Sequence, residues 1–186
     1  MPPVARHNTP VILFVTLGTQ PRLPVFANAR FHESFARACA QADAWRVGKY
    51  LIMPDHLHLF CTPARVERAG IKRWAAYLKE RITKNLNSMC TGNGLARLGT
   101  ASPSRRSNQT PAIPPMEGED FGELSRGAVP SRQSWKWQPD CWDTQLRNQE
   151  HYHDKWEYVR MNPVRQDFVT RAEDWPWQGE LHVLPW

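Results

Sequence analysis

Residues 45–63 read WRVGKYLIMPDHLHLFCTP, and this stretch decides the fold. It holds two apolar runs, Trp45–Met53 and His56–Cys61, which only Pro54 and Asp55 separate. Proline interrupts regular structure, and a two-residue connection between such runs is typical of an antiparallel hairpin. We therefore predict two paired strands joined by a tight turn.

On both sides of this hairpin, the apolar residues recur with the period of a strand or of a helix. The elements predicted around the hairpin are a strand at Val11–Thr19, a helix at Phe31–Ala42, a helix at Arg65–Asn87, a strand at Cys141–Arg147, a helix at Gln149–Met161 and a short helix at Val164–Val169. This order is that of the ferredoxin-like, or split βαβ, fold. We predict an α+β protein with a four-stranded antiparallel sheet, helices on one face and a further C-terminal helix.

The chain of 186 residues is long enough for one domain, which we place at 1–177. Residues 88–134 are dense in Gly, Pro, Ser, Thr and Asn and show no sustained periodicity, so we predict a disordered insertion there. Residues 178–186 are predicted as a C-terminal tail without regular structure.

Charge and composition limit the classes of partner. The formal net charge is +6 and the sequence pI is about 9.4, a balance that favours a polyanionic partner. No apolar run reaches the ~20 residues of a membrane span, and residues 1–10 lack the features of a signal peptide. The four cysteines form no C-x-x-C pair, which argues against a zinc knuckle and favours buried thiols.

The predicted helix at 65–87 has a basic face opposite its apolar stripe. Its cations are Arg65, Arg68, Lys72, Arg73, Lys79, Arg81 and Lys84. A solvated basic surface and a face that follows a phosphate backbone explain this pattern equally well.

His56 and His58 are the first candidates for chemistry. Side chains alternate along a strand, so these two imidazoles project to one side, while Leu57 and Leu59 project to the other. Two imidazoles on one face can bind a divalent ion. The alternative is a pair of surface or hydrogen-bonded histidines.

Tyr158 is the second candidate. On the predicted helix it points away from the apolar stripe formed by Trp156 and Val159. A tyrosine hydroxyl becomes a competent nucleophile beside a cation or a metal-bound phosphate, and the alternative is an ordinary helix tyrosine. Asn162 lies one turn later on the same face, and it could instead cap the next helix.

These residues belong to a wider pattern. The stretch Met53–Phe60, MPDHLHLF, resembles the HUH motif of single-tyrosine transposases. Later segments are similar to the C-terminal signature of the REP-associated tyrosine transposases: Trp137-Gln138-Pro139, Cys141-Trp142-Asp143, Arg147-Asn148, Tyr152, Glu157-Tyr158, Asn162-Pro163-Val164 and Asp174-Trp175-Pro176-Trp177. The resemblance extends from about residue 11 to residue 177, excluding the insertion.

The resemblance implies a transposase that cuts single-stranded DNA near imperfect hairpins through a 5′-phosphotyrosine, with no nucleotide cofactor. It implies that His56 and His58 bind Mg²⁺ or Mn²⁺, that Tyr158 is the nucleophile and that Asn162 occupies the position of a third metal ligand. The residues expected to contact DNA are Arg68, Lys72, Arg73, Lys79, Lys84, Arg147 and Arg165. We expect a cytoplasmic, nucleoid-associated monomer or homodimer.

Two other classes of function stay open at this stage. One is a non-catalytic DNA- or RNA-hairpin-binding protein derived from such a transposase. The other is an RNA-binding protein, because ferredoxin-like sheets also present aromatic residues to RNA; the predicted strands, however, carry no aromatic ribonucleoprotein motif. Three tryptophans are candidates for stacking on bases, with core packing as the alternative: Trp135, Trp137 and Trp142.

Overall fold

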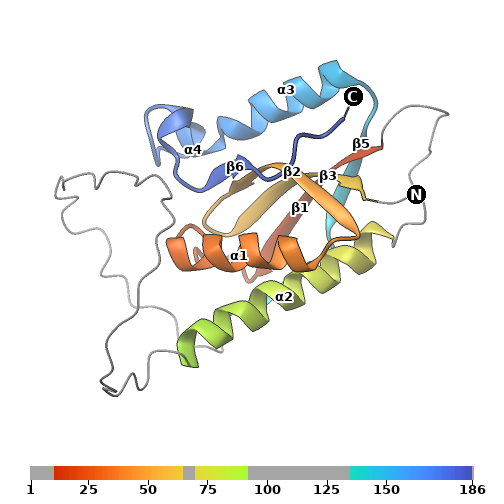
Figure 1. The fold of residues 1–186 in the computed structure, drawn as a ribbon. Helices are drawn as coiled ribbons and strands as arrows, with labels where there is room; N and C mark the ends of the chain where they lie inside the picture. The colour runs from red at the N-terminus through yellow and green to blue at the C-terminus, as the bar shows by residue number, and fades with distance from the viewer. Residues whose placement is uncertain (1–10, 65–69, 92–134, 186) are drawn as a thin grey trace, which may run out of the picture.

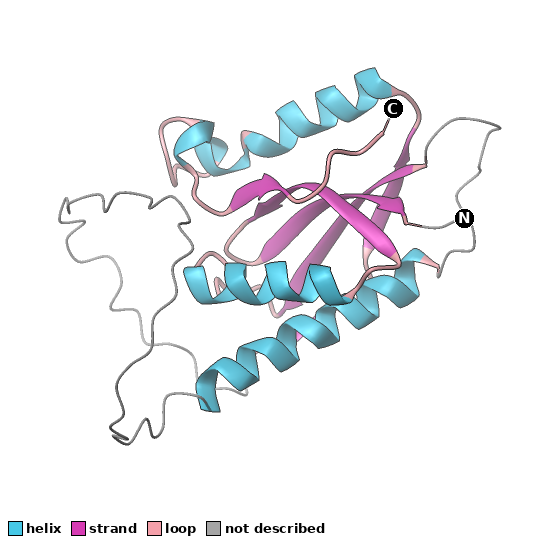
Figure 2. Ribbon diagram, in the orientation of Figure 1, coloured by secondary structure: helices cyan, strands magenta, loops and turns pink. Residues whose placement is uncertain are grey.

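The computed structural model describes residues 11–64, 70–91 and 135–185. The structure is an α+β fold, in which helices pack against an antiparallel sheet (Figures 1 and 2). Its strands are β1 (Ile12–Gln20), β2 (Trp45–Ile52), β3 (His56–Pro63), β4 (Lys136–Trp137), β5 (Trp142–Leu146) and β6 (Gln178–Glu180). The helices are α1 (Ala29–Gln41), α2 (Ile71–Thr91), α3 (Gln149–Arg160) and α4 (Asn162–Arg165), with a short 3₁₀ turn at Ala172–Asp174.

The strands follow the order β4-β1-β3-β2-β6, and β5 also pairs with β1. The predicted hairpin forms: β2 pairs with β3 in antiparallel register, from Trp45 opposite Pro63 to Ile52 opposite Leu57. β3 in turn pairs with β1 through six consecutive residue pairs. The histidine strand is therefore flanked on both sides by long strands, and a central strand has little freedom to shift its register.

Two layers of helices cover the sheet. α1 and α2 lie together against one face, and α3 lies across the opposite face (Figure 1). Leu57 and Leu59 of β3 are fully buried with α1 and α2 residues such as Phe35 and Leu78. This burial fixes the faces of β3, because each apolar residue turned into the main core turns its polar neighbour to the α3 side.

Three predictions about the elements are corrected. The sheet has more than the four predicted strands, because β4 and β6 have two and three residues, too few to show an alternating pattern. α2 continues to Thr91, so the start of the predicted insertion is helical, and residues 92–134 lie outside the described ranges. The short helix is at Asn162–Arg165 rather than 164–169, with Pro163 in its first turn.

The predicted C-terminal tail is also partly regular and is anchored to β2. The Trp175 indole N–H donates to the Ile52 carbonyl at 2.9 Å, and the Ile52 N–H donates to the Trp177 carbonyl at 2.8 Å. β6 then pairs with β2. Leu184 covers Gly48 so closely that a Cβ there would lie 2.5 Å from the leucine Cγ. Residues 178–184 are thus part of the folded domain.

The structure also bears on the predictions about membrane-spanning segments and cysteines. None of the helices in the described ranges is long and apolar enough to cross a membrane. Cys39, Cys61 and Cys141 are free and buried, as predicted, while the side chain of Cys90 lies outside the described part of the chain.

Candidate active site on the histidine strand

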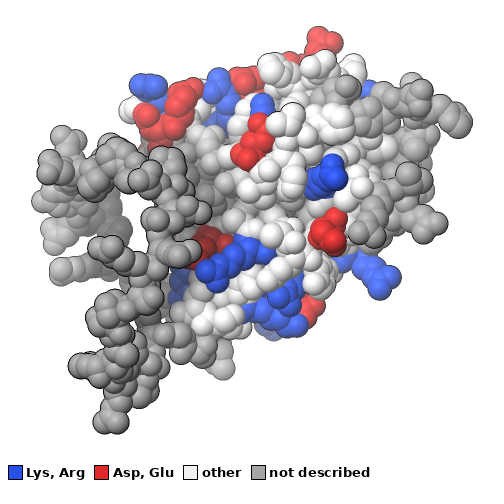
Figure 3. All heavy atoms as spheres, viewed as in Figure 1, with Lys and Arg blue, Asp and Glu red and all other residues white. Residues whose placement is uncertain are grey.

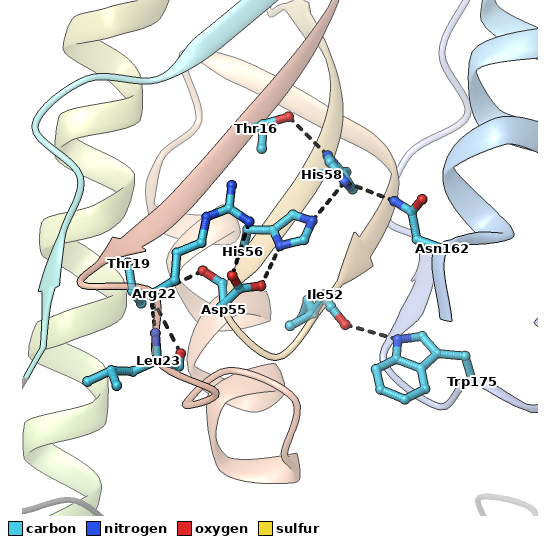
Figure 4. Close-up of polar contacts among 10 residues, drawn as sticks. All are labelled: Thr16, Thr19, Arg22, Leu23, Ile52, Asp55, His56, His58, Asn162 and Trp175. Carbon is cyan, nitrogen blue, oxygen red and sulfur yellow. Dashed lines mark hydrogen bonds and ion pairs between the residues drawn. The ribbon is translucent and has the colours of Figure 1, made fainter. Parts of the chain in front are cut away.

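The two histidines of β3 meet on the α3 side of the sheet. The Nε2 atom of His56 lies 3.2 Å from the Nε2 atom of His58, and the rings are nearly perpendicular (Figure 4). The strand alternation predicted from the sequence therefore brings the two imidazoles together edge to edge. The contacts of their other nitrogens decide what these two edges can bind.

A carboxylate orients His56. Its Nδ1 lies 2.6 Å from Asp55 Oδ1, and Arg22 pairs with the other carboxylate oxygen at 3.2 Å (Figure 4). Partial burial opposes ionisation of Asp55, but the hydrogen bond from His56 and the charges of His56 and Arg22 outweigh it and lower the pKa. An ionised carboxylate only accepts hydrogen bonds. His56 Nδ1 therefore carries a proton toward Asp55, and Nε2 is the ring nitrogen that faces His58.

His58 is held from three sides. Its Nδ1 lies 2.9 Å from the Thr16 hydroxyl, its ring stacks on Phe14 at 5.2 Å, and its Nε2 lies 3.2 Å from Asn162 Nδ2. Burial, together with the positive charges of His56 and Lys155, lowers the pKa of His58 to about 3. The ring is thus neutral at pH 7. Because the Asn162 amide donates to Nε2, that nitrogen is the acceptor of the ring and carries no proton.

The two Nε2 atoms lie at the separation of an N–H···N hydrogen bond. The pair can therefore share a proton in line, or both nitrogens can turn their lone pairs to one cation. Within the described ranges, no group of three or more His, Cys, Asp or Glu side chains is placed to hold a metal ion. A metal site here would thus depend on the histidine pair and on neutral or solvent oxygens.

Asn162 joins the tyrosine helix to the histidines. Its amide nitrogen points to His58, and its Oδ1 accepts a short hydrogen bond from Arg165. The structure therefore brings three of the predicted site residues together, although Asn162 acts here as a hydrogen-bond donor. To offer its oxygen to an ion beside His58, the amide must turn by half a rotation and Arg165 must release it.

Tyr158 lies one helical turn before Asn162 and is 62% exposed. The Arg165 guanidinium carbon lies 4.2 Å from the centre of the phenol ring, and Arg165 also donates to the Tyr158 carbonyl. On the other side, Lys155 Nζ lies 5.7 Å from this ring centre and 5.1 Å from that of Phe14. An accessible phenol between two cations, next to the histidine pair, suits a group that meets a phosphate.

The helix that carries this phenol is fixed at its start and along its buried stripe. Asn148 caps α3, because its side chain accepts the His151 backbone N–H at 2.8 Å. Tyr152 and Val159 are buried against the sheet, and Phe60 meets Tyr152 and Trp156 in edge-to-face contacts. This packing leaves Lys155 over Phe14 of β1 and the exposed Tyr158 ring beside Lys155.

The predicted DNA contacts on α2 lie in the other helical layer. Lys72 pairs with Asp140 at 2.6 Å, Lys84 pairs with Glu80 at 2.5 Å, and Arg73 lines a cavity with Asp43 and Tyr77. Arg68 lies outside the described residues. In Figure 3, basic side chains lie over α1 and α2 in the lower part of the view, with acidic ones among them. This surface is separated from the histidine pair by the sheet.

Lys79, another of the predicted DNA contacts, is turned into the fold rather than toward solvent. It is buried, and its ammonium donates to the carbonyls of Gln138 and Asp140 at 2.7 and 2.8 Å. Burial lowers its pKa, while Cys141 and Asp140 act in the opposite direction. Two donors of the ammonium are thus used by backbone carbonyls of the β4–β5 connection. Lys79 therefore connects α2 to the segment between β4 and β5.

Replacing Lys79 by methionine is expected to lower the free energy of unfolding by about 2–3 kcal/mol, because two partly buried hydrogen bonds from a charged donor are lost. The measurement is urea denaturation followed by tryptophan fluorescence. The matched control is Lys84→Met, which removes an exposed ion pair and should cost less than about 1 kcal/mol. Equal effects of the two substitutions would contradict the structural role of Lys79.

Of the other two predicted DNA contacts, one lies on the histidine side of the sheet and the other at the end of a strand. Arg165 lies against Tyr158 as described above, and Arg147 is exposed at the end of β5.

Four further residues of the site were not predicted from the sequence: Thr16, Arg22, Asp55 and Lys155. Asp55 directly precedes His56 and could have been noticed as its partner; the other three come from elements that only the strand register and helix packing bring close.

Comparisons with known proteins give the following relatives. No protein-family model matches the chain. The chain is 23% identical over 129 residues to a Haemophilus influenzae protein named "Putative REP-associated tyrosine transposase", covering 69% of this chain and 54% of that protein. It is 38% identical over 40 residues to the REP-associated tyrosine transposase of Escherichia coli K12, covering 22% of this chain and 24% of that one.

One solved structure adds a likeness in fold. It is a REP-associated tyrosine transposase bound to a REP hairpin, with a TM-score of 0.53 and 16% identity, over 96% of this chain and 82% of that one. At this identity the likeness shows the fold alone.

The fold and the site thus define a mixed α+β protein in which a helix tyrosine and two strand histidines lie on one side of an antiparallel sheet. Its resemblance to the REP-associated tyrosine transposases, first indicated by the motifs, is confirmed by these relatives. The match spans about half the length of the H. influenzae relative and about a quarter of that from E. coli, so the activity of the whole protein is a matter for proposal.

Proposed function

We propose that this protein is a metal-dependent endonuclease and strand transferase that cuts single-stranded DNA beside imperfect hairpins through a 5′-phosphotyrosine on Tyr158. The observation that carries the proposal is the meeting of Asn162, one turn after Tyr158, with the facing His56 and His58 nitrogens. A relative of similar fold is described as bound to a REP hairpin, which supports this class of substrate.

The scaffold that we assign to this activity is the ferredoxin-like one. β5, β1, β3 and β2 lie side by side in this order, all neighbours antiparallel, with the connections of a split βαβ unit. β4 and β6 are then short additions to that core. In such a unit the helices cover one face of the sheet, and here α3, the tyrosine helix, covers the other (Figure 1).

The histidine pair fits a divalent ion. Neighbouring ligands of an octahedral ion, each about 2.1 Å from it, lie about 3.0 Å apart, and the two Nε2 atoms are separated by 3.2 Å. Asp55 and Thr16 orient the rings from behind, as outer hydrogen-bond partners of metal-binding histidines do. A bound Mg²⁺ or Mn²⁺ would polarise the scissile phosphate as a Lewis acid.

The residues of the chain then have separate roles in the reaction. The Tyr158 hydroxyl oxygen attacks the phosphorus, so an O–P bond to tyrosine forms while the bond to the 3′ oxygen breaks. The phenol proton passes to solvent, and the departing 3′ oxygen takes up a proton. Arg165 and Lys155 hold positive charge beside the phenol, where the phosphate arrives. Attack by another 3′-hydroxyl reverses the step and joins new strands.

The test is covalent capture of DNA. Wild-type protein is incubated with labelled single-stranded DNA that carries the hairpins flanking its own gene, in the presence of Mn²⁺ or of EDTA. We expect a labelled band that survives denaturation, that appears with Mn²⁺ and that disappears with EDTA. Tight hairpin binding without any such band would instead favour the non-catalytic binding protein.

Asp55 offers a test of the metal site that is independent of cleavage. Asp55→Asn should lower the affinity for Mn²⁺ by about 10- to 100-fold, because His56 loses the carboxylate that fixes its protonated nitrogen. The measurement is calorimetric titration of Mn²⁺ into the protein without DNA. The matched control is Asp43→Asn, an exposed position in the other layer. An Asp55→Asn variant that binds Mn²⁺ like wild type would count against the site.

A further inference from the structure

A second surface feature lies beside the histidine pair and has no role in the chemistry above. It is a cavity of about 510 Å³ between the chain that follows β1 and the chain that leads into β5. Its lining includes Arg22, Gln138 and Trp142, and we call it the Trp142 groove. Its volume is within the range of about 300–1,000 Å³ that is usual for ligand sites.

The strand register places the Trp142 groove next to the site. Trp142 is opposite Thr16, and Thr16 is opposite His58, so all three side chains stand on one face in a row across the sheet. With strands about 4.8 Å apart, the backbones of Trp142 and His58 lie about 10 Å apart. About three stacked nucleotides, or fewer unstacked ones, cover that distance at 3.4 Å each.

Gln138 brings the lining of the groove to within one strand of His56. Gly18 is opposite His56 in the register. The Gln138 side chain lies over Gly18, with its Oε1 at 3.3 Å from the position that a Cβ would take. The groove is therefore linked to the histidine pair through the strand register of Trp142 and through the Arg22–Asp55 ion pair, since Asp55 also contacts His56.

Trp142 differs from the other tryptophans of its segment. Trp135 and Trp137 are half-buried against Phe26, and the Trp137 indole N–H donates to the Thr83 hydroxyl. Trp142 is 79% exposed. Packing thus explains the first two but leaves the ring of Trp142 in water, which is costly for so large an apolar surface. An exposed aromatic ring that lines a groove is suited to stacking on an unpaired base.

Arg22 supplies the charge that a nucleotide needs. It is 68% exposed, and its contact with Asp55 at 3.2 Å is a surface ion pair, which is weak enough to be exchanged for a phosphate. The acidic residue on the rim, Asp140, is itself paired with Lys72 and with the Cys141 N–H. The groove thus combines an apolar ring with an available guanidinium.

We propose that the Trp142 groove binds one unpaired nucleotide of the DNA strand within about three nucleotides of the scissile phosphate, with its base stacked on Trp142 and its phosphate on Arg22. This subsite rests on the proposed function, since it selects the single-stranded flank of the substrate rather than the hairpin stem. It gives the protein a way to fix the position of the cut relative to the hairpin.

The experiment measures binding to flank DNA in which one base at a time is replaced by an abasic site. All proteins carry Tyr158→Phe, so that no strand is cut, and Trp142→Ala, Trp142→Leu and Trp142→Phe are compared on this background. Tyr77→Ala, which removes an exposed ring from the other helical layer, is the matched control. Thermal unfolding midpoints verify that each variant is folded.

We expect Trp142→Ala and Trp142→Leu to weaken binding by about 5- to 150-fold, while Trp142→Phe and Tyr77→Ala stay close to the parent. The parent should lose affinity at one abasic position, and Trp142→Ala should no longer respond there. Arg22→Ala should reduce the salt dependence by about one phosphate contact.

Unchanged affinity of the Trp142→Ala and Trp142→Leu variants, or the same response to every abasic position as in the parent, would overturn the subsite alone. The proposed function would then stand if the wild-type protein still forms the covalent band. A parent protein that binds no single-stranded DNA, with no covalent band from the wild type, would overturn both proposals.

Discussion

Replacing Tyr158 by phenylalanine is expected to abolish the covalent DNA–protein adduct. The substitution removes only the attacking oxygen, so no O–P bond to the protein can form. The ring stays in place for its contact with Arg165, and the capped start and buried stripe of α3 are untouched. Affinity for hairpin DNA should therefore remain within about 3-fold of wild type, because the ring and its two neighbouring cations are retained and one hydroxyl hydrogen bond contributes about 0.5 kcal/mol.

Adduct formation is measured on denaturing gels with labelled DNA and Mn²⁺, and binding is measured separately on native gels. Tyr77→Phe is the matched control, since it deletes the hydroxyl of another exposed tyrosine in the α1–α2 layer. Adducts that persist in the Tyr158→Phe protein would assign the nucleophile to another residue. Loss of adducts in the Tyr77→Phe protein would mean that the assay responds to something other than the attacking group.

Much of the fold could be predicted because its central elements show strong periodicity. The β3 pattern of polar and apolar residues fixes which side chains enter the core, and its observed bounds, His56–Pro63, extend the predicted run by two residues. α2 and α3 likewise follow their apolar stripes. The faces of the histidines could thus be derived from the alternation of the strand.

The parts that could not be predicted depend on contacts between distant segments. Lys79 looks like any other cation of a basic helix until the carbonyls of Gln138, 59 positions away, are placed beside it. β6 is too short to show a period. The contact between Asn162 and His58 spans 104 positions, and no local pattern encodes it. The resemblance alone placed these two residues in one site.

The same separation bears on the residues expected to contact DNA. Net charge and a basic helix face predict a polyanionic partner, but they do not state on which side of a sheet it binds. The described cations of α2 lie in the layer opposite the histidines, whereas Arg22, Lys155 and Arg165 surround the pair and the phenol. Position relative to the reactive groups, rather than local charge density, identifies the residues to test.

Replacing His58 by alanine is expected to remove Mn²⁺ binding and to lower the rate of adduct formation by about 100- to 1,000-fold, the range of a few kcal/mol of lost charge stabilisation. His58 makes more contacts within the site than His56 does, since Thr16, Phe14, His56 and Asn162 all touch its ring. Its loss frees the amide that connects the tyrosine helix to β3. His58→Ala should therefore remove metal binding and also loosen the tyrosine helix from β3. His56→Ala should remove metal binding but keep the contact between Asn162 and His58.

Mn²⁺ binding is followed by calorimetry and by the rise in unfolding temperature that a ligand specific for the folded state produces. The matched control is His153→Ala, because His153 is an exposed histidine on α3 with His151 two positions before it, a spacing that does not bring two helix side chains together. It should bind Mn²⁺ like wild type. If the His58→Ala protein still showed the full Mn²⁺-dependent rise in unfolding temperature, or if the His153→Ala protein lost it, the ion would have to bind elsewhere. The facing nitrogens on β3 would then be an ordinary hydrogen-bonded pair in which one ring carries the shared proton.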